Sequence, residues 1–371
     1  MRIGFDAKRL FHNNTGLGNY SRDLIKLLIN YYPENVYILF NPKPHNHPRF
    51  ALDQASYQEV NPAGFWKNAK GLWRSFGISQ ESATENLDIY HGLSGEIPFS
   101  LAEPIKKIVT IHDLIFLRYP ELYTKVDVKI HEKKFKYACK KADIIIAVSE
   151  QTKNDIIHFF GTNPEKIKVI YQGCSAIFKE RFSEQEKTEV LNRLGLPQQF
   201  LLNVGTIEKR KNALAIVKAI KETNISLILV GKKTAYFDEI ERFLKINNMQ
   251  NQVIVLQNLT QRELAIIYQL ATIFIYPSIF EGFGIPIIEA LYSGVPVITN
   301  TTGVFPEAAG PESIYVNVMD DIDIKNKILS LWQDADKRKQ MSQAGLAFVQ
   351  KFNEEQLAKT WYKTYQQLNN L

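Results

Sequence analysis

The chain has very little cysteine and no long apolar run, and each absence excludes a class of protein. Cys139 and Cys174 are its only cysteines, too few for the disulfide framework of a small secreted domain. Neither has a metal-ligand spacing from a histidine, so both are expected to be small core residues. The apolar run in the opening MRIGFDAKRL is shorter than a secretory signal needs, and no segment approaches the ~20 apolar residues of a membrane span. The sequence therefore indicates a protein that is made and kept in the cytoplasm.

The sequence also lacks a strong imbalance of charge. Its formal net charge is +6, and it has no dense basic patch interleaved with aromatics that would indicate a nucleic-acid partner. The lysines do form one regular stripe along a predicted helix, at Lys125, Lys129, Lys133, Lys136 and Lys140. Two interpretations fit this stripe, a solvated helix face and a surface for an anionic membrane or an anionic acceptor.

Length and composition indicate two folded domains. At 371 residues the chain exceeds the roughly 100–200 residues of one ordinary domain. Short apolar runs alternate with amphipathic stretches of helical length, which predicts parallel β-α-β units. The first series of predicted strands covers 3–5, 36–40, 89–90, 108–111, 144–148 and 167–170. The second covers 200–204, 227–230, 253–256, 273–276 and 295–298.

A polar segment separates the two series of strands. We therefore predict an N-terminal Rossmann-like acceptor-binding domain over 1–177 and a C-terminal Rossmann-like donor-binding domain over 178–352. A last helix is expected over 353–371, where Asn353 can cap it, and it should pack back onto the N-terminal domain. Open α/β sheets bind ligands at the carboxyl ends of their strands, so the chemistry is expected there.

The stretch EGFGIPIIEALYSGVPVI follows a predicted strand of the second domain and combines a glycine-rich turn with two glutamates. Gly282 and Gly284 allow a tight turn before a helix that has Pro286 in its first turn. Free N–H groups at such a helix start can bind an anion. Glu281 lies in the turn and Glu289 lies in the helix, so their roles should differ. Each carboxylate can accept hydrogen bonds from the paired hydroxyls of a sugar or ribose.

This stretch resembles the signature of the retaining glycosyltransferases of family four, which have the two-domain GT-B fold. The resemblance implies that Glu281 lies by the donor sugar and that Glu289 binds the ribose hydroxyls. It also implies that Phe283, Gly284 and Ile285 offer backbone amides to the donor. The expected fold class is thus α/β, with two Rossmann-like, doubly wound parallel sheets facing a central cleft.

The loop GTIEKRKN follows the first strand of the second domain and contains three cations. Arginine binds phosphate through two N–H groups, and lysine binds it as a point charge. Family members have an arginine directly after the glycine and a lysine five residues further on, both on the donor's pyrophosphate. Lys211 matches the lysine, but Thr206 follows Gly205 where the arginine is expected, a departure shared by a subgroup reading V-G-T-x-E-x-R-K-N. We predict that Arg210 replaces the missing arginine and that Lys209 is a solvated charge.

Two segments of the first domain are also candidates. The loop NNTGLGNYSRDLI contains Gly16 and Gly18, and family members use a glycine here to let the diphosphate and the acceptor approach. Gly18 is the better match, although an ordinary turn also explains a lone G-x-G, and the spacing does not fit a nicotinamide site. His112 and Asp113 follow the strand 108–111. The resemblance places His112 near the C6 hydroxyl of the donor sugar, and a structural His–Asp pair is the alternative.

Two further motifs are best explained by helix capping. Ser149, in AVSEQTKND, resembles a recurring family position, but an N-cap role explains it without a function. The run MDDID at 319–323 resembles the acidic metal motif of other glycosyltransferases, yet its place at a helix start indicates capping. GT-B enzymes usually need no bound metal, so no metal or cofactor is expected.

The sequence thus predicts an enzyme that transfers a hexose from a nucleotide diphosphate sugar to a hydroxyl, with retention at the anomeric carbon. The resemblance implies a front-face mechanism in which the departing phosphate takes the acceptor's proton. The subgroup pattern favours GDP-mannose, UDP-hexoses stay open, and a glycan or lipid-linked glycan of polysaccharide or glycolipid biosynthesis is the expected acceptor. Two alternatives are an epimerase or phosphorylase of the same fold and a non-catalytic module that binds a nucleotide sugar or glycan.

The segment GFWKNAKGLWRSFG mixes large apolar residues with basic ones. It contains Phe65, Trp66, Leu72, Trp73 and Phe76 together with Lys67, Lys70 and Arg74. Packing in the core is one interpretation of these side chains. The other is a peripheral contact with the inner face of the plasma membrane, where a lipid-linked acceptor would dock.

Overall fold

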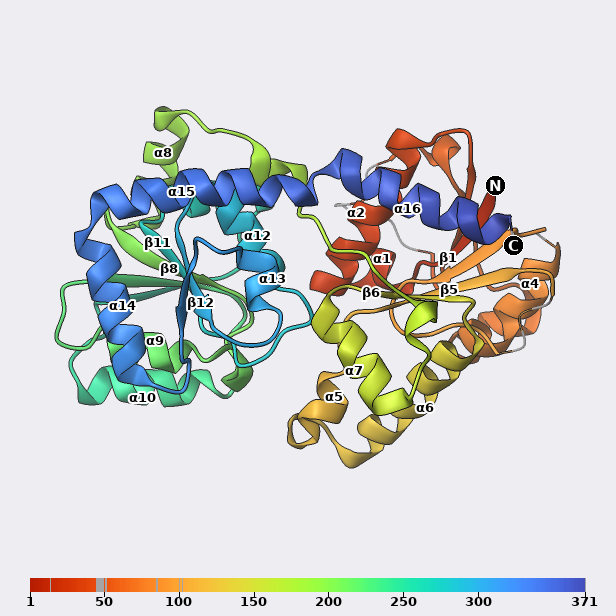
Figure 1. The fold of residues 1–371 in the computed structure, drawn as a ribbon, viewed down its shortest axis with the longest axis horizontal. Coiled ribbons are helices and arrows are strands. Elements are labelled where there is room, and N and C mark those ends of the chain that lie inside the picture. The colour runs from red at the N-terminus through yellow and green to blue at the C-terminus, as the bar shows by residue number, and fades with distance from the viewer. Residues whose placement is uncertain are drawn as a thin grey trace. The chain divides into compact units, whose positions relative to one another are not determined.

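The chain folds into two compact units (Figure 1). The structure is a computed structural model that describes residues 1–13, 15–44, 50, 52–84, 86–99, 101 and 103–370. The first unit contains Met1–Gly173 and Phe352–Leu371, and the second contains Cys174–Lys351. The division lies four residues before the predicted boundary at 177/178. Leu371, the last residue of the predicted terminal helix, lies outside the described residues.

A seven-stranded sheet forms the centre of the first unit, in the order β3-β2-β1-β4-β5-β6-β7. All of its pairings are parallel. Its strands are β1 Arg2–Asp6, β2 Val36–Phe40, β3 Gln58–Val60, β4 Ile89–Gly92, β5 Lys106–Ile111, β6 Ile144–Ala147 and β7 Ile167–Val169. The helices of this unit are α1 Lys8–His12, α2 Gly16–Tyr31, α3 Lys70–Leu72, α4 Ile78–Thr84, α5 Ile115–Arg118, α6 Lys125–Lys141, α7 Glu150–Phe160 and α16 Glu354–Asn369.

Helices cover both faces of this sheet, because successive residues of a strand point to opposite faces and both sets are apolar. In β6, Ile144 and Ile146 join the cluster that contains residues of α1, α2 and α16. Ile145 and Ala147 join the cluster on the other face, with residues of α4, α6 and α7. The sheet is therefore doubly wound (Figure 1).

The second unit repeats this design around a six-stranded parallel sheet, in the order β10-β9-β8-β11-β12-β13. Its strands are β8 Phe200–Val204, β9 Ser226–Val230, β10 Val253–Leu256, β11 Ile273–Tyr276, β12 Val297–Asn300 and β13 Ile314–Val316. Its helices are α8 Glu184–Leu194, α9 Ala213–Ala219, α10 Phe237–Ile246, α11 Gln261–Leu270, α12 Ile285–Tyr292, α13 Phe305–Ala309, α14 Asp321–Gln333 and α15 Ala335–Val349. Figure 1 shows α9, α10 and α14 on one side of the sheet and α12 and α15 on the other.

The predicted α/β class with two parallel sheets is confirmed, and the differences from the predicted strands have local causes. The sequence analysis missed β3 and β13, which are three-residue strands at sheet edges. It also began β12 two residues early, at Val295. The Val295 N–H bonds to the carbonyl of Ala290 in α12, and Pro296 has no N–H for a sheet.

The predicted capping residues cap their helices. The side chains of Ser149, Asp320 and Asn353 accept hydrogen bonds from backbone N–H groups at the starts of α7, α14 and α16. Cys139 and Cys174 are both buried, as expected of small core residues.

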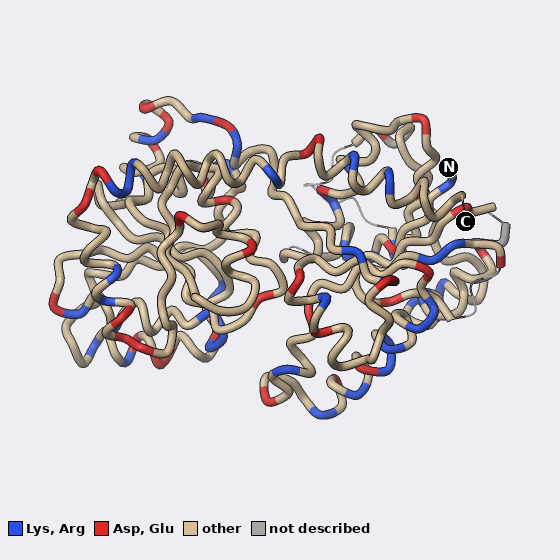
Figure 2. Tube along the Cα trace, viewed as in Figure 1, with Lys and Arg blue, Asp and Glu red and all other residues tan. Residues whose placement is uncertain are grey.

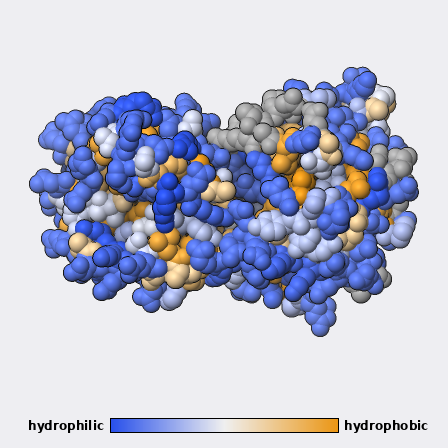
Figure 3. Space-filling model, turned by 90° about the horizontal axis from the view of Figure 1, so that it is seen from above, coloured by the Kyte–Doolittle hydropathy of each residue, from blue (hydrophilic) through white to orange (hydrophobic). Residues whose placement is uncertain are grey.

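The surface is predominantly polar. On the face that Figure 3 shows, hydrophobic residues form small separate patches among hydrophilic ones. Within the described part of the chain, no helix combines the length and apolar character needed to cross a bilayer.

The C-terminal helix α16 returns to the first unit and completes its core. Trp361, Tyr365 and Leu368 are buried in the cluster that also contains residues of α2 and β1. The Tyr365 hydroxyl bonds to Nδ1 of His91 at 2.8 Å, and Nε2 of His91 bonds to Thr110 Oγ1 at 2.8 Å. Burial lowers the pKa of His91 to about 3, so its ring stays neutral and uses both nitrogens in hydrogen bonds.

Tyr365→Phe should lower the free energy of unfolding by about 1–3 kcal/mol, because it leaves a buried ring nitrogen of His91 without its partner. Urea unfolding followed by circular dichroism measures this loss. Lys363→Ala, at an exposed position of the same helix, is the control and should change stability by less than about 0.5 kcal/mol. Equal stability of the two variants would contradict the role given to the Tyr365–His91 bond.

Candidate active site

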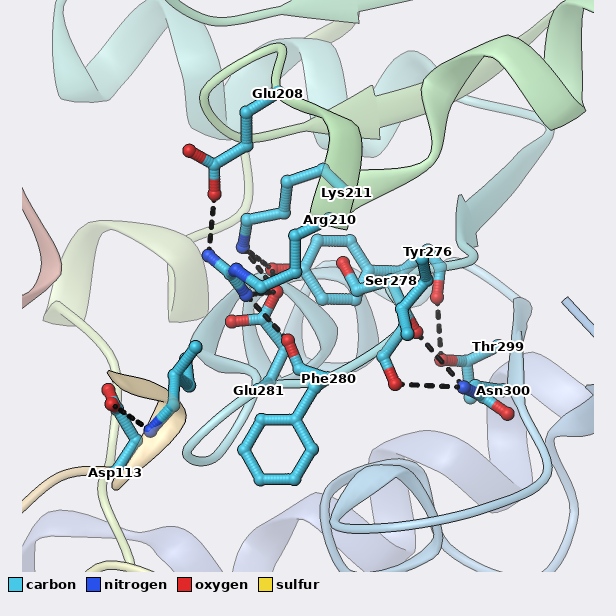
Figure 4. A network of polar contacts seen from close by, with 12 residues as sticks. Asp113, Glu208, Arg210, Lys211, Tyr276, Ser278, Phe280, Glu281, Thr299 and Asn300 are labelled. Carbon is cyan, nitrogen blue, oxygen red and sulfur yellow. Dashed lines mark hydrogen bonds and ion pairs between the residues drawn. The ribbon is translucent and has the colours of Figure 1, made fainter. Parts of the chain in front are cut away.

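Three sequence-predicted residues of the second unit, Glu281, Arg210 and Lys211, meet with Tyr276 in one ion cluster, which we call the Glu281 cluster (Figure 4). Oε1 of Glu281 lies 2.8 Å from Nη1 of Arg210 and 2.5 Å from Nζ of Lys211. The Tyr276 hydroxyl donates to the same oxygen at 3.1 Å. No group of the described residues donates to the second oxygen, Oε2, so that atom can still accept a hydrogen bond.

The strand order of the sheet brings these side chains together. Arg210 and Lys211 follow β8, in the short helix η7 Lys209–Lys211, whereas Tyr276 ends β11 and Glu281 lies in the loop after it. β8 and β11 are hydrogen-bonded neighbours, so their carboxyl ends lie at the same edge of the sheet. The Ile279 N–H donates to the carbonyl of Arg210 at 2.9 Å, which fixes one loop to the other.

Further bonds hold Arg210 in place. Its Nη1 donates to the carbonyl of Phe280 at 2.5 Å, and its Nη2 contacts Glu208 Oε1 at 2.7 Å. Lys209, beside it, is exposed, which agrees with the prediction of a solvated charge. Hydrogen bonds therefore fix the orientation of the Arg210 guanidinium, whereas the neighbouring Lys209 is exposed to solvent.

The charges of the Glu281 cluster support one another. Burial opposes ionisation of Glu281, but the charges of Lys211 and Arg210 outweigh it and lower the pKa of Glu281 to about 2. Burial likewise works against the charge of Lys211, and Glu281 nevertheless raises its pKa. Burial and the charge of Glu281 raise the pKa of Tyr276 to about 12. At neutral pH the cluster therefore holds one carboxylate, two cations and a neutral phenol.

Glu289 has a different environment, as its place inside a helix predicts. The Tyr268 hydroxyl donates to Oε2 of Glu289 at 2.9 Å and lies 3.3 Å from the carbonyl of Pro286. Tyr268 is fully buried in α11, so it fixes the orientation of this carboxylate. The sequence analysis missed Tyr268, because no motif connects it with α12.

Gly284, one of the two glycines predicted to form the turn before α12, has a positive φ, and so has Gly205 after β8. Gly284 caps the start of α12 with φ +106°, and Gly205 follows β8 with φ +146°, and L side chains rarely adopt either value. Phe283 is buried, and Ile285 is the first residue of α12. In the first turn of α12, Pro286 has no N–H and the Ile287 N–H donates to the carbonyl of Gly284 at 2.9 Å, so the N–H of Ile285 is the one left without an intrahelical acceptor among these three residues. Thr206 follows Gly205 and is half-buried.

His112 belongs to the first unit, where it follows β5. Its Nε2 donates to the carbonyl of Leu93 at 2.9 Å, so its Nδ1 accepts from Nε2 of Gln172 at 3.0 Å. Burial, with a smaller effect of Arg9, lowers its pKa to about 4. His112 is therefore a neutral ring whose tautomer is set by its two partners.

Asp113 does not pair with this ring in the way the structural alternative supposed. One oxygen of its side chain accepts the N–H of Ile115 at 3.1 Å, at the start of α5. Gln172, which does bond to His112, had no motif to mark it in the sequence.

The two glycines of the first unit differ in how much space surrounds them. Both lie in the first turn of α2. A Cβ on Gly18 would lie 1.8 Å from the carbonyl oxygen of Asn13, whereas one on Gly16 would meet nothing within 4 Å. Only Gly18 is therefore required to be glycine by its surroundings.

The acidic side chains were also considered as ligands of a metal ion. No group of three histidine, cysteine, aspartate or glutamate side chains there could hold an ion. The acidic run at 319–323 instead caps α14 through Asp320.

The chain matches two family models, one for each half. Residues 184–348 match the model for group 1 glycosyl transferases, and residues 15–176 match the model for glycosyltransferase family 4. O-antigen chain mannosyltransferase B of Escherichia coli is 30% identical over 274 residues, which cover 72% of this chain and 71% of that protein. O-antigen chain mannosyltransferase RfbU of Salmonella typhimurium is 29% identical over 228 residues, 61% of this chain and 60% of that protein.

Solved structures share the fold over almost the full length. Sucrose-phosphate synthase of Thermosynechococcus elongatus aligns with a TM-score of 0.81 at 21% identity and covers 99% of both chains. HepE of Anabaena, in complex with UDP and glucose, aligns with a TM-score of 0.76 at 18% identity, over 99% of this chain and 100% of that one. The fold is GT-B, and the chain is a glycosyltransferase that belongs to family 4, as its EGFGIPIIEALYSGVPVI stretch predicted.

Proposed function

We propose that the protein is a retaining hexosyltransferase that uses a nucleotide diphosphate sugar, with Arg210 and Lys211 binding the donor's diphosphate. The observation that carries the proposal is the Glu281 cluster, in which two buried cations share one carboxylate oxygen. A diphosphate offers more negative charge than one carboxylate, so it can replace Glu281 as the partner of both cations. Side chains neutralise the donor in this scheme, and it requires no metal cofactor.

Release from the cations would leave Glu281 beside the donor sugar. Its Oε2 has no donor among the described residues, so a sugar hydroxyl can bond there. Transfer by a front-face mechanism needs no protein nucleophile, because the leaving phosphate takes the proton of the acceptor. The protein then contributes fixed positive charge where negative charge develops on the leaving group.

We assign the remaining contacts of the donor to residues at or near α12 and to His112 of the first unit. Glu289, oriented by Tyr268, would accept from the ribose hydroxyls, and the amides of Phe283, Gly284 and Ile285 would face the phosphates or the sugar. His112 would lie at the C6 hydroxyl as a neutral ring, and a hydroxyl that donates to Nδ1 would replace the amide of Gln172 there.

GDP-mannose is the proposed donor, and a glycan or lipid-linked glycan is the proposed acceptor. The support for mannose comes from the two O-antigen chain mannosyltransferases that resemble this chain. The support for a UDP-sugar comes from HepE, whose structure contains UDP. Melting temperatures measured with GDP, UDP and their sugars separate these donors, because a ligand that binds only the folded chain raises the melting temperature.

Arg210→Gln should lower kcat by roughly 10²–10³-fold, because it removes a fixed charge that stabilises the leaving diphosphate. Initial rates of hexose transfer from the donor measure the loss. Lys209→Gln removes a charge of the same sign from the neighbouring exposed position, and it should stay within about twofold of the wild-type rate. Equal losses in both variants would contradict the assignment of Arg210, and products formed from the donor alone would indicate an epimerase instead.

We also propose a peripheral contact with an anionic membrane, made by the lysine stripe of α6. All five lysines of the stripe are exposed, and Figure 2 shows basic residues following one another along this helix. Val126 and Ile130, between them in sequence, expose 65% and 47% of their surface. An exposed mixture of lysine and large apolar residues is typical of a helix that lies on a lipid surface.

The segment GFWKNAKGLWRSFG, residues 64–77, also has exposed apolar side chains, although part of it is packed in the core. Trp73 is fully buried and Arg74 pairs with Asp6, which agrees with the packing interpretation. Phe65 and Leu72, however, are 75% and 56% exposed. The two interpretations of this segment therefore apply to different side chains within it.

Replacement of the five stripe lysines by glutamine should reduce binding to anionic vesicles by at least ~10-fold, since each lysine contributes about 1 kcal/mol near such a surface. Co-sedimentation with phosphatidylglycerol vesicles measures the bound fraction. Ile246→Ser, at an exposed apolar position of the second unit, is the control and should bind as the wild type does. Wild-type protein that does not sediment with the vesicles would refute the membrane contact.

A further inference from the structure

Two neighbouring cations of the first unit have no partner among the residues that the structure describes. Lys8 and Arg9 lie in α1, directly after the carboxyl end of β1, and both are half-buried. Among the described residues, neither the Lys8 ammonium nor the Arg9 guanidinium takes part in a hydrogen bond or an ion pair. Arg242 also lacks a partner in the described part of the chain, but it is exposed and fully hydrated. A half-buried guanidinium without a counter-charge loses hydration without compensation.

The acidic groups nearby are already engaged with other cations. Asp6 pairs with Arg74 and accepts the backbone N–H of Lys8 at 3.1 Å. Glu96 lies 3.1 Å from Nζ of Lys134 and 3.7 Å from Nη1 of Arg74. The two carboxylates are thus matched by Arg74 and Lys134, and the charges of Lys8 and Arg9 remain in excess.

The excess of positive charge affects the pKa of Lys8. Burial lowers the pKa of its ammonium, and the positive charges of Arg74 and Arg9 lower it further, against the smaller opposing effect of Asp6 and Glu96. The charge of Arg9 also reaches His112, the ring at the end of β5. His112 is neutral, so it neither repels nor balances the two cations. This edge of the first sheet therefore carries uncompensated positive charge.

We propose that Lys8 and Arg9 form a second anion site, which binds a phosphate or diphosphate group of the acceptor. Arginine and lysine side by side offer the directed N–H groups and the point charge that suit phosphate oxygens. The donor's own diphosphate has its cations in the second unit, at Arg210 and Lys211. This assignment of the acceptor's chemistry rests on the proposed function, whereas the anion site itself rests only on the first unit.

Calorimetric titration with inorganic pyrophosphate tests the site. Wild-type protein should bind pyrophosphate at two sites, because each pair of cations offers one. The double variant Lys8→Gln and Arg9→Gln should weaken one of them by at least ~10-fold, the loss expected for charged hydrogen bonds to phosphate. The double variant Arg210→Gln and Lys211→Gln should weaken only the other. A control, Lys363→Gln with Arg242→Gln, removes two exposed charges and should bind as the wild type does.

Three outcomes would overturn the proposal. Unchanged pyrophosphate binding by the Lys8 and Arg9 variant would show that these cations hold no anion. Loss of all binding in either double variant would show one shared site for the donor's diphosphate. Displacement of pyrophosphate from the first-unit site by saturating GDP or UDP would assign that site to the donor. If Arg210 and Lys211 instead proved irrelevant to nucleotide binding, the proposed function would fail while the first-unit site stood.

Thermal unfolding separates a binding role from a structural one. Because the two charges repel each other and lack partners, the Lys8 and Arg9 variant should melt at or above the wild-type temperature. A large drop in its melting temperature would show that the two side chains serve the fold and would contradict the proposal.

Discussion

One buried carboxylate shared by two cations is the interaction on which the second unit's site depends. Without Glu281, Arg210 and Lys211 would be two like charges held close together at a sheet edge, with burial acting against both. Without the cations, Glu281 would be a mostly buried carboxylate with no counter-charge, which is costly. The cluster therefore keeps all three groups ionised. It also keeps the cations oriented for a stronger anionic partner.

The parallel sheet makes this cluster possible. Its neighbouring strands β8 and β11 end at the same edge, so a loop with two cations and a loop with a carboxylate meet there. Gly205, at the start of one loop, and Gly284, at the end of the other, have backbone conformations that other residues rarely adopt. Helix α12 then begins four residues after Glu281. The first unit uses the same rule, since Lys8 follows β1 and His112 follows β5, but among the described residues Lys8 and Arg9 share no carboxylate.

Local pattern predicted most of the fold and marked Glu281, Arg210 and Lys211, whereas the contacts that join these residues to one another escaped it. Most strands could be predicted from their short apolar runs. The glycine turn between Glu281 and Glu289 could be predicted as well. Arg210 came from an argument about a missing arginine at Thr206, and the structure gives it the same carboxylate partner as Lys211. Tyr268 and Gln172 were not predictable, because each acts through one hydrogen bond to a residue far away in sequence. The lack of partners at Lys8 and Arg9 could be recognised only from the folded chain.

In the proposed function, Glu281 pairs with Arg210 and Lys211 until the donor's diphosphate replaces it. Calorimetric titration of GDP or UDP into wild-type protein and into Glu281→Gln tests this exchange. Loss of the competing charge should tighten nucleoside diphosphate binding by roughly 3–10-fold, on the scale of one charged hydrogen bond. Binding that is equal or weaker in Glu281→Gln would contradict the exchange of carboxylate for diphosphate.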